Sequence, residues 1–213
     1  MCGRYSLNAS ASQVIEYFNL RYETDQIRRE FREEKEVFPT NVEPVVRASD
    51  GIRILDKLSW GVKYDWNAKE QINARFDRLH SSPIWSKLIK RKRCIIPATA
   101  YWEWNENEPK GNNRYEIFPL KSDILPFAGI TDTFIDRKGI KRTGFIVITM
   151  DANPHIAKIH DRQPGMILPE NIDAWLDDSI VDPRELIYHA TENELEFKKV
   201  PNVMDQPGYG QGR

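Results

Sequence analysis

Residues 145–150 read Phe-Ile-Val-Ile-Thr-Met, a nearly continuous apolar run, and this run decides the fold that the sequence predicts. A strand that is apolar on both faces lies in the middle of a sheet that is covered on both sides. The stretch Asp-Ala-Asn-Pro at 151–154 follows directly and breaks the strand. We therefore expect a central strand over 145–150, with the rest of the chain packed around it.

Shorter segments on either side of this run predict further strands and a few helices. Asp50-Gly51 is a hairpin signal between extended segments at 45–47 and 52–60. Ser10 and Gln13 have capping-box spacing before an amphipathic helix, and Ser82-Pro83 is a typical helix start. The other expected elements are strands at 94–97, 101–104, 114–118 and 127–130, a charged helix or loop at 21–36, and helices at 169–176 and 182–189.

Together these elements predict an α+β fold in a single domain, dominated by antiparallel strands joined by hairpins. A chain of 213 residues is long enough for one domain with a sizeable core and rather short for two. We expect the domain to cover residues 1–200. Residues 201–213 are rich in Gly and Pro, which predicts a loosely ordered tail.

Composition limits the class of protein. Hydrophobic residues make up 40% and charged residues 30%, no apolar run reaches the length of a membrane span, and the N-terminus lacks a signal region. Cys2 and Cys94 alone cannot form a disulfide framework, so we expect a reducing, cytoplasmic setting. The formal net charge of −1 means that any contact with nucleic acid must come from a local patch.

Cys2 follows the initiator methionine, and removal of Met1 would leave an α-amine beside a thiol. An α-amine has a pKa near 7.7–8.0, so roughly a tenth is neutral at pH 7. A neutral amine condenses with an aldehyde to an imine, and the adjacent thiol can then close a thiazolidine ring. The same pair could act as an N-terminal nucleophile on an amide. Alternatively, Cys2 has no chemical role and is simply the second residue of the chain.

Glu103 lies between two tryptophans in an extended segment. Strand alternation places Trp102 and Trp104 on one face and Tyr101 and Glu103 on the other. If the face with Glu103 is buried, loss of hydration raises the pKa of its carboxyl group and makes a general acid or base. The alternative is a solvated glutamate on an outward face.

Two further polar clusters end apolar segments. Asn73 could orient a substrate oxygen and Arg75 could hold a phosphate as a bidentate fork, or the two could be a turn asparagine and a surface arginine. His160-Asp161-Arg162 could be a proton donor with a phosphate clamp, or a surface ion-pair cluster.

The basic run at 90–93, the tryptophans and the other histidines are weaker candidates for functional residues. The basic run at 90–93 is interpreted as a solvated helix end, with a DNA-facing surface as the alternative. Trp60 and Trp85 are expected in the core, whereas Trp66 lies in polar loop sequence and could stack on a base. No metal site and no cofactor are expected, because the remaining histidines lack ligand spacing: His80, His155 and His189.

Six motifs in order resemble one known family, the SRAP family of SOS-response-associated, abasic-site-processing proteins. They span residues 1 to about 176, and a match of six ordered motifs is far more specific than any one of them. The motifs are Met-Cys-Gly-Arg-Tyr at 1–5, Asn-Val-Glu-Pro at 41–44, Trp-Gly at 60–61, Ile-Asn-Ala-Arg at 72–75, Tyr-Trp-Glu-Trp at 101–104 and His-Asp-Arg-Gln-Pro at 160–164.

This resemblance implies a β-barrel-like core flanked by helices, and covalent capture of abasic sites in single-stranded DNA through the N-terminal cysteine. It implies an imine intermediate that also permits lyase cleavage, and association with the nucleoid after DNA damage. By motif position it assigns Cys2 as the nucleophile and Asn73, Glu103 and His160 as its active-site partners. It assigns DNA contacts to Arg4, Arg75, Trp66, Thr149 and Arg162.

The chain departs from the usual family pattern at several positions. The loop at 62–65 has no proline ahead of Trp66, Glu43 stands where Ala is common, and Gln163 and Gly165 differ from commoner residues. Two other functions remain open from the residues alone: an N-terminal-nucleophile cysteine peptidase that acts on its own initiator Met or on peptides, and a DNA-binding module without chemistry.

Overall fold

The computed structural model describes residues 2–20, 31–136 and 138–201. The expected central strand is confirmed as β10 (Lys141–Asp151), which pairs with β9, β4, β5 and β11. Its side chains alternate between two hydrophobic cores, with Ile146 and Ile148 in one and Phe145 and Val147 in the other. Burial on both faces is the physical reason for the continuous apolar run.

The larger sheet closes on itself. Its strand order is β11-β10-β4-β3-β6-β9-β12-β13, and β9 also pairs with β10, so that β10, β4, β3, β6 and β9 form a ring. This closure confirms the barrel-like core and the α+β class. The bounds are β3 Val42–Ser49, β4 Ile52–Trp60, β5 Asn73–Arg75, β6 Arg93–Ala98, β9 Leu125–Ile135, β11 Arg162–Pro164, β12 Met166–Ile167 and β13 Ile187–Tyr188.

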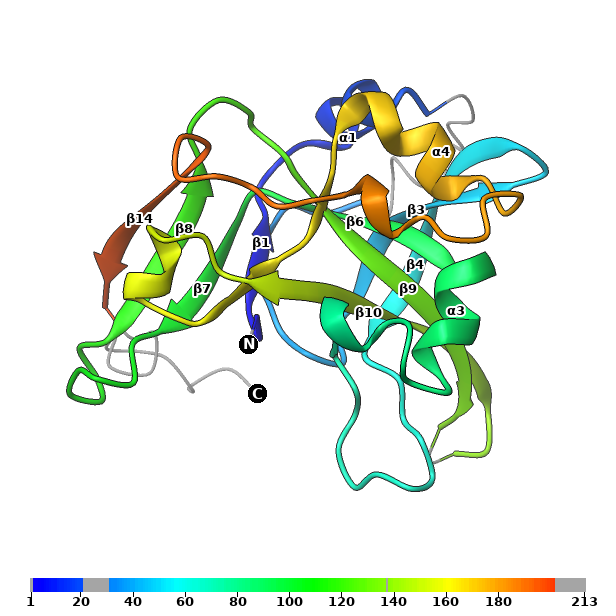
Figure 1. The fold of residues 1–213 in the computed structure, drawn as a ribbon, viewed down its shortest axis with the longest axis horizontal. Coiled ribbons are helices and arrows are strands. Elements are labelled where there is room, and N and C mark those ends of the chain that lie inside the picture. Colours follow the sequence, from blue (N-terminus) through cyan, green and yellow to red (C-terminus); the bar gives the residue numbers. More distant parts are fainter. Residues whose placement is uncertain (1, 21–30, 137, 202–213) are drawn as a thin grey trace.

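A smaller sheet packs against one side of this ring and carries the start of the chain (Figure 1). Tyr5 and Tyr101 are fully buried and place their rings against the ring strands, with centroids 5.1 Å from Trp60 and 5.9 Å from Phe127 respectively. The strand order is β14-β8-β7-β1-β2, with bounds β1 Tyr5–Leu7, β2 Glu34–Val37, β7 Ala100–Trp104, β8 Arg114–Pro119 and β14 Leu195–Val200.

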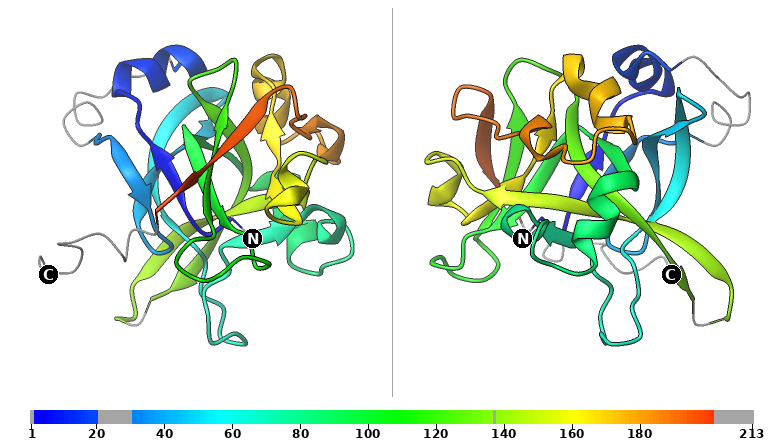
Figure 2. Two further views of the ribbon diagram at one scale, coloured as in Figure 1. Left: turned by 90° about the vertical axis from the view of Figure 1, so that its left-hand side faces the viewer. Right: turned by 45° about the vertical axis from the view of Figure 1, so that its right-hand side comes forward.

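Figures 1 and 2 show helices α1 (Ala11–Phe18), α3 (Trp85–Arg91) and α4 (Ile172–Leu176), whose apolar side chains belong to the core that contains Ile146 and Ile148. The capping box of α1 is confirmed, because the Ser10 hydroxyl accepts from the Gln13 N–H and the Gln13 side chain accepts from the Ser10 N–H. Single turns of 3₁₀ helix occur at Phe76–Arg78, Ile156–Lys158, Pro169–Asn171 and Arg184–Leu186. No helix in the described ranges is long and apolar enough to cross a lipid bilayer.

Several expectations were wrong in detail. The helix expected at 182–189 is a 3₁₀ turn followed by β13, because Ile187 and Tyr188 pair with β12. Residues 34–36 of the expected charged helix or loop belong to β2, which ends at Val37. Residues 195–200, for which no element was expected, form β14. Residues 21–30, and 202–213 of the expected tail, lie outside the described residues.

The basic run at 90–93 does not form a single solvated surface. Helix α3 ends at Arg91, and Arg93 is buried in β6. The Arg93 guanidinium donates to the carbonyl oxygens of Ile89 and Lys90 at 2.7 and 2.5 Å, and to those of Trp175 and Asp177. Arg93 therefore joins the ends of α3 and α4, which removes it from any DNA-facing surface.

Gly144 gives a test of the ring closure. A Cβ atom at this position would lie 2.2 Å from the backbone oxygen of Gly61 where β10 meets the end of β4. Because backbone cannot move aside as a flexible side chain can, we expect Gly144→Ala to lower the free energy of unfolding by about 3 kcal/mol. Urea denaturation measures this change.

Gly139→Ala is the matched control for this substitution. Its Cβ would meet nothing within 4 Å, so only the positive φ of 76° costs free energy, about 1 kcal/mol. Equal losses for the two variants would contradict the tight approach of β10 to Gly61.

Candidate active site

Cys2 lies buried at the start of the chain, three residues before β1 begins. The Asn73 side chain donates from Nδ2 to the Cys2 carbonyl oxygen at 2.8 Å. Asn73 is the first residue of β5, and parallel pairing with Val147 of β10 fixes its backbone. The structure therefore brings two of the predicted residues into direct contact and ties the chain start to the central strand.

Glu103 lies on β7, the strand that pairs with β1. Only 2% of Glu103 is exposed, so the solvated alternative is wrong and this carboxyl group faces the interior. Burial raises the pKa of Glu103 to about 7. Burial, and then the nearby Glu103 carboxylate, raise the pKa of the Cys2 thiol well above its ordinary range. The thiol is therefore protonated at neutral pH in this state of the chain.

His160 lies just before β11 and brings its imidazole to Glu103. Its Nε2 is 3.8 Å from Glu103 Oε2, and its Nδ1 accepts a hydrogen bond from the Arg162 N–H at 3.0 Å. Burial lowers the pKa of His160, so the ring is neutral at pH 7. A neutral ring that accepts at Nδ1 carries its proton on Nε2, which faces Glu103.

Asp161 Oδ1 also lies 3.0 Å from His160 Nδ1, and the two contacts to that nitrogen compete. One nitrogen cannot accept from an N–H and donate to a carboxylate at the same time. The Asp161 side chain is 84% exposed and free to turn into water, whereas the Arg162 N–H is fixed by the backbone. We therefore assign the Nε2–H tautomer.

A buried amide network holds the loop that carries His160. Asn153 Oδ1 accepts from the N–H groups of His155 and Ile156, both at 2.9 Å, and starts the 3₁₀ turn before His160. The Gln163 side chain accepts from the Asn153 N–H at 2.8 Å, and both amide side chains donate to the Ala190 carbonyl oxygen. Gln163, a departure from the family pattern, thus has a structural role.

Arg162 and Thr149, two of the residues assigned to DNA, are buried. The Arg162 guanidinium donates to Asp151 and, at 2.5 Å, to the Thr149 carbonyl oxygen. Thr149 is 0% exposed, and its hydroxyl group has no hydrogen-bond partner among the described residues. In this conformation the Arg162 side chain braces β10 against β11 and does not face solvent.

Arg4, Arg75 and Trp66 lie at the surface. The Arg4 guanidinium is 4.0 Å from the centre of the Phe38 ring and 3.6 Å from Glu36, which also pairs with Arg114 at 2.8 Å. Arg75 makes a bidentate pair with Asp77 at 2.9 and 2.8 Å. Trp60 and Trp85 are buried as expected, whereas Trp66 is 63% exposed.

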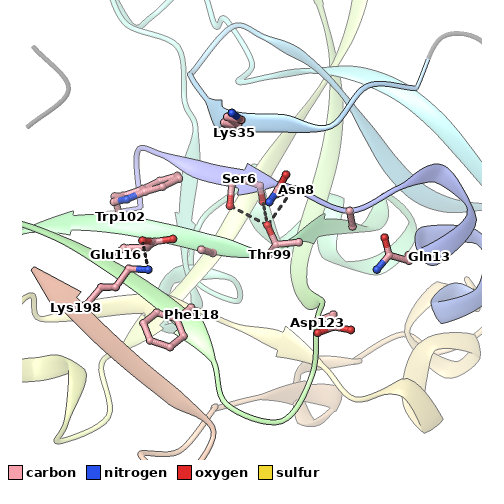
Figure 3. A pocket seen from close by; sticks show the side chains of 12 residues that line it. Ser6, Asn8, Gln13, Lys35, Thr99, Trp102, Glu116, Phe118, Asp123 and Lys198 are labelled. Carbon is pink, nitrogen blue, oxygen red and sulfur yellow. Dashed lines mark hydrogen bonds and ion pairs between the residues drawn. The ribbon is translucent and has the colours of Figure 1, made fainter. Parts of the chain in front are cut away.

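A separate groove of about 570 Å³ lies on the outer face of the smaller sheet (Figure 3). Its polar groups bind one another: Thr99 meets Ser6 at 2.9 Å, and Lys198 pairs with Glu116 at 3.0 Å. The four residues assigned to catalysis do not line it.

The sequence did not single out Glu36, Asn153 or Tyr64, which hold Arg4, the His160 loop and Trp66 respectively. Glu36 belonged to the segment expected as a charged helix or loop, so the sequence held no signal for its contacts with Arg4 and Arg114. The Asn-Pro break after the central strand marked Asn153 as a turn residue, but it did not reveal which groups its amide would bind.

The fold and site define a single-domain α+β protein with an N-terminal cysteine set among an amide, a carboxyl group and a neutral imidazole. The family model described as SOS response associated peptidase (SRAP) matches residues 1–207, and the chain belongs to this family. This confirms the resemblance read from the six motifs.

Similar proteins carry related names. The chain is 30% identical to "Abasic site processing protein YoqW" of Bacillus subtilis, over 97% of this chain and 95% of that protein. It is 29% identical to "Abasic site processing protein YedK" of Escherichia coli, over 83% and 79%. A crystal structure of a protein from Bacteroides thetaiotaomicron superposes with a TM-score of 0.79 at 24% identity, over 94% of this chain and 93% of that one, which shows the shared fold.

The buried Glu103 predicts a pH-dependent stability. Its pKa in the folded chain, about 7, lies above the ordinary 4.5, so the folded state binds more protons between these values. Folding stability therefore falls as pH rises from about 4.5 to 7, by up to about 3 kcal/mol. We expect Glu103→Gln to be more stable than the parent at pH 8, and the difference to shrink below pH 5. Urea melts across pH 4.5–8 measure it; a difference independent of pH would contradict the assignment.

Proposed function

We propose that this protein captures abasic sites in single-stranded DNA by forming a thiazolidine through Cys2. The observation that carries the proposal is the contact of the second residue with Asn73, in an interior that also holds Glu103 and His160. The family membership and the names of the relatives support abasic-site processing as the activity.

The chemistry begins once Met1 is removed and the Cys2 amine is released. The amine attacks the C1′ aldehyde of the open abasic sugar, and loss of water gives an imine. The thiol then adds to the imine carbon as its proton leaves, and the nitrogen takes up a proton. The net change is an aldehyde plus an aminothiol giving a thiazolidine and one water.

Glu103 suits the proton transfers in these steps. With a pKa of about 7 its carboxyl group is present in both forms at neutral pH, so it can donate to the departing hydroxyl group and accept from the thiol. The neutral His160 can donate from Nε2 to the ring oxygen of the sugar as it opens. Asn73 orients the sugar oxygens beside the bound Cys2 backbone.

The DNA is held through its backbone and flanking bases. Arg75 offers an exposed cation and Arg4 a partly buried one to phosphates, and Trp66 offers a ring to an unpaired base. Thr149 and Arg162 shape the wall behind the sugar. Phosphate contacts without base-edge contacts give selectivity for the lesion with little preference for sequence. The imine also permits β-elimination, so a weak lyase activity accompanies capture, in a cytoplasmic protein that joins the nucleoid after damage.

A second activity, removal of its own Met1 by an N-terminal nucleophile, is favoured by the position of Cys2. The bond to be cleaved is the Met1–Cys2 peptide bond, directly before Cys2. The Cys2 thiol is buried near Glu103, which could act as its base. The intact mass of protein made by cell-free synthesis without aminopeptidase tests this. Loss of about 131 Da, the mass of a methionine residue, from the parent but not from Cys2→Ala would support self-processing.

The cysteine chemistry gives the main test of the proposal. Incubation with abasic single-stranded DNA and a denaturing gel should show a slow band for the parent and none for Cys2→Ala. Cys2→Ser keeps the amine but has no thiol, so it should give a band only after borohydride reduction of the imine. Cys94→Ala is the matched control, because this second buried thiol lies in β6 and should not matter.

Two results would overturn the assignment. A band from Cys2→Ala would show that the Cys2 thiol does not form the crosslink. Full activity of protein that retains Met1 would show that the Cys2 amine does not form the imine. Peptide cleavage without any DNA band would favour the peptidase.

Arg75 tests the phosphate contact. Its side chain is half exposed and would exchange Asp77 for a phosphate. We expect Arg75→Ala to weaken binding at low salt and to reduce the slope of log K against log salt by about 0.7, the value for one contact on a single strand. Lys87→Ala on α3 is the control cation. An unchanged slope for Arg75→Ala would exclude this contact.

A further inference from the structure

The loop between β4 and β5, residues 61–72, carries an aromatic pair that the covalent chemistry does not use. The rings of Tyr64 and Trp66 are stacked, with centroids 5.2 Å apart and planes 14° from parallel. Trp66 is 63% exposed, so the ring face turned away from Tyr64 is open to solvent. Figures 1 and 2 show this loop projecting from the body on the side where the chain begins.

Tyr64 is fixed from behind by two elements distant in sequence. Its hydroxyl group donates to Asp132 Oδ2 of β9 at 2.8 Å. Its ring also meets the edge of Trp85, the buried first residue of α3, at 6.1 Å and 62°. The pair is thus anchored to the ring of strands through Asp132 and to the helical layer through Trp85.

The backbone of the loop supports the same arrangement. Val62 and Gln71 bond to each other as an isolated bridge and close the base of the loop. The Asn67 N–H donates to the Tyr64 carbonyl oxygen at 3.0 Å, a turn that sets Tyr64 and Trp66 on the same side. An exposed tryptophan without such support would lose conformational entropy on binding, whereas a fixed one has already lost it on folding.

We propose that Tyr64 is a positioning residue that holds Trp66 as a preformed stacking surface for the unpaired base next to the abasic site. The proposal rests on the proposed function, because it assumes that single-stranded DNA runs from Cys2 past β5 to this loop. An indole face stacks on any base and most strongly on a purine. The anchored pair therefore gives the protein a preference for a purine in a single-stranded position beside the lesion.

Binding without chemistry isolates this effect. A single strand with a tetrahydrofuran abasic analogue has no aldehyde, and 2-aminopurine placed in turn at each neighbouring position reports stacking by loss of fluorescence. With the parent protein we expect strong quenching at one position. Trp66→Ala should abolish that quenching and weaken binding about 5- to 150-fold, with an unchanged salt slope.

Variants of the anchor test the positioning role. Tyr64→Phe keeps the ring but loses the hydrogen bond to Asp132. The quenching should therefore be smaller than with the parent, and so should the ratio of the affinities for a purine and a pyrimidine next to the abasic site. Asp132→Ala should give the same partial loss, and the double variant should be no worse than either single one, because both remove one interaction. The control is Tyr188→Phe, which removes a tyrosine–carboxylate bond to Glu194 at β13.

Crosslinking to a true abasic strand separates the two proposals. At saturating DNA the parent and the control Tyr188→Phe should crosslink at the same rate, because the Cys2 chemistry is intact in both. If the parent crosslinks but the parent and Trp66→Ala quench 2-aminopurine equally, the stacking role of Trp66 is wrong and the proposed function stands. Equal quenching by the parent and Tyr64→Phe would overturn the positioning role. No crosslinking by the parent would overturn the proposed function.

Discussion

The hydrogen bond from Asn73 Nδ2 to the Cys2 carbonyl oxygen is the contact on which the site depends. Chain ends are usually poorly ordered unless something ties them down. Here β1 is paired on both sides by β2 and β7, and the Trp102 N–H donates to the Arg4 carbonyl oxygen at 3.1 Å. Asn73 extends this order to the second residue, and its own position follows from the pairing of β5 with the central strand. A reactive terminus gains its advantage from fixed orientation.

Burial then sets the protonation states around Cys2. The same loss of hydration raises the pKa of Glu103 to about 7 and lowers the pKa of His160, so a carboxyl group that is partly protonated at neutral pH lies beside a neutral imidazole. A buried carboxyl group weakens the fold above its ordinary pKa. A buried carboxyl group that lowers folding stability at neutral pH is typical of a functional site rather than of a core selected for stability.

The sequence predicted the elements whose signals are local. The apolar run of β10, the hairpin around Asp50-Gly51 and the capping box at Ser10 each depend on neighbouring residues. β2 and β14 escaped prediction because three of four residues in Glu-Lys-Glu-Val and three of six in Leu-Glu-Phe-Lys-Lys-Val are charged. Each strand also has only one buried residue, Val37 or Leu195.

The candidate site residues were assigned by the resemblance of motifs. Without it, each residue had both a functional and a purely structural interpretation. Strand alternation placed Glu103 opposite Trp102, but only the packed sheets decide which face is buried. Spacing could not reveal that the Arg162 guanidinium turns inward to Asp151, or that Tyr64 would stack on Trp66. These depend on contacts between segments far apart in the chain.

Arg4 and Arg75, the two arginines proposed to contact phosphates, already bind carboxylates in the structure. Glu36 holds Arg4 together with Arg114, and Asp77 holds Arg75, so each phosphate must displace a carboxylate before it gains a cation. The net free energy from each contact is therefore smaller than an unpaired arginine would supply. Under the proposed function, selectivity would therefore come from the covalent step at Cys2 rather than from tight binding of intact strands.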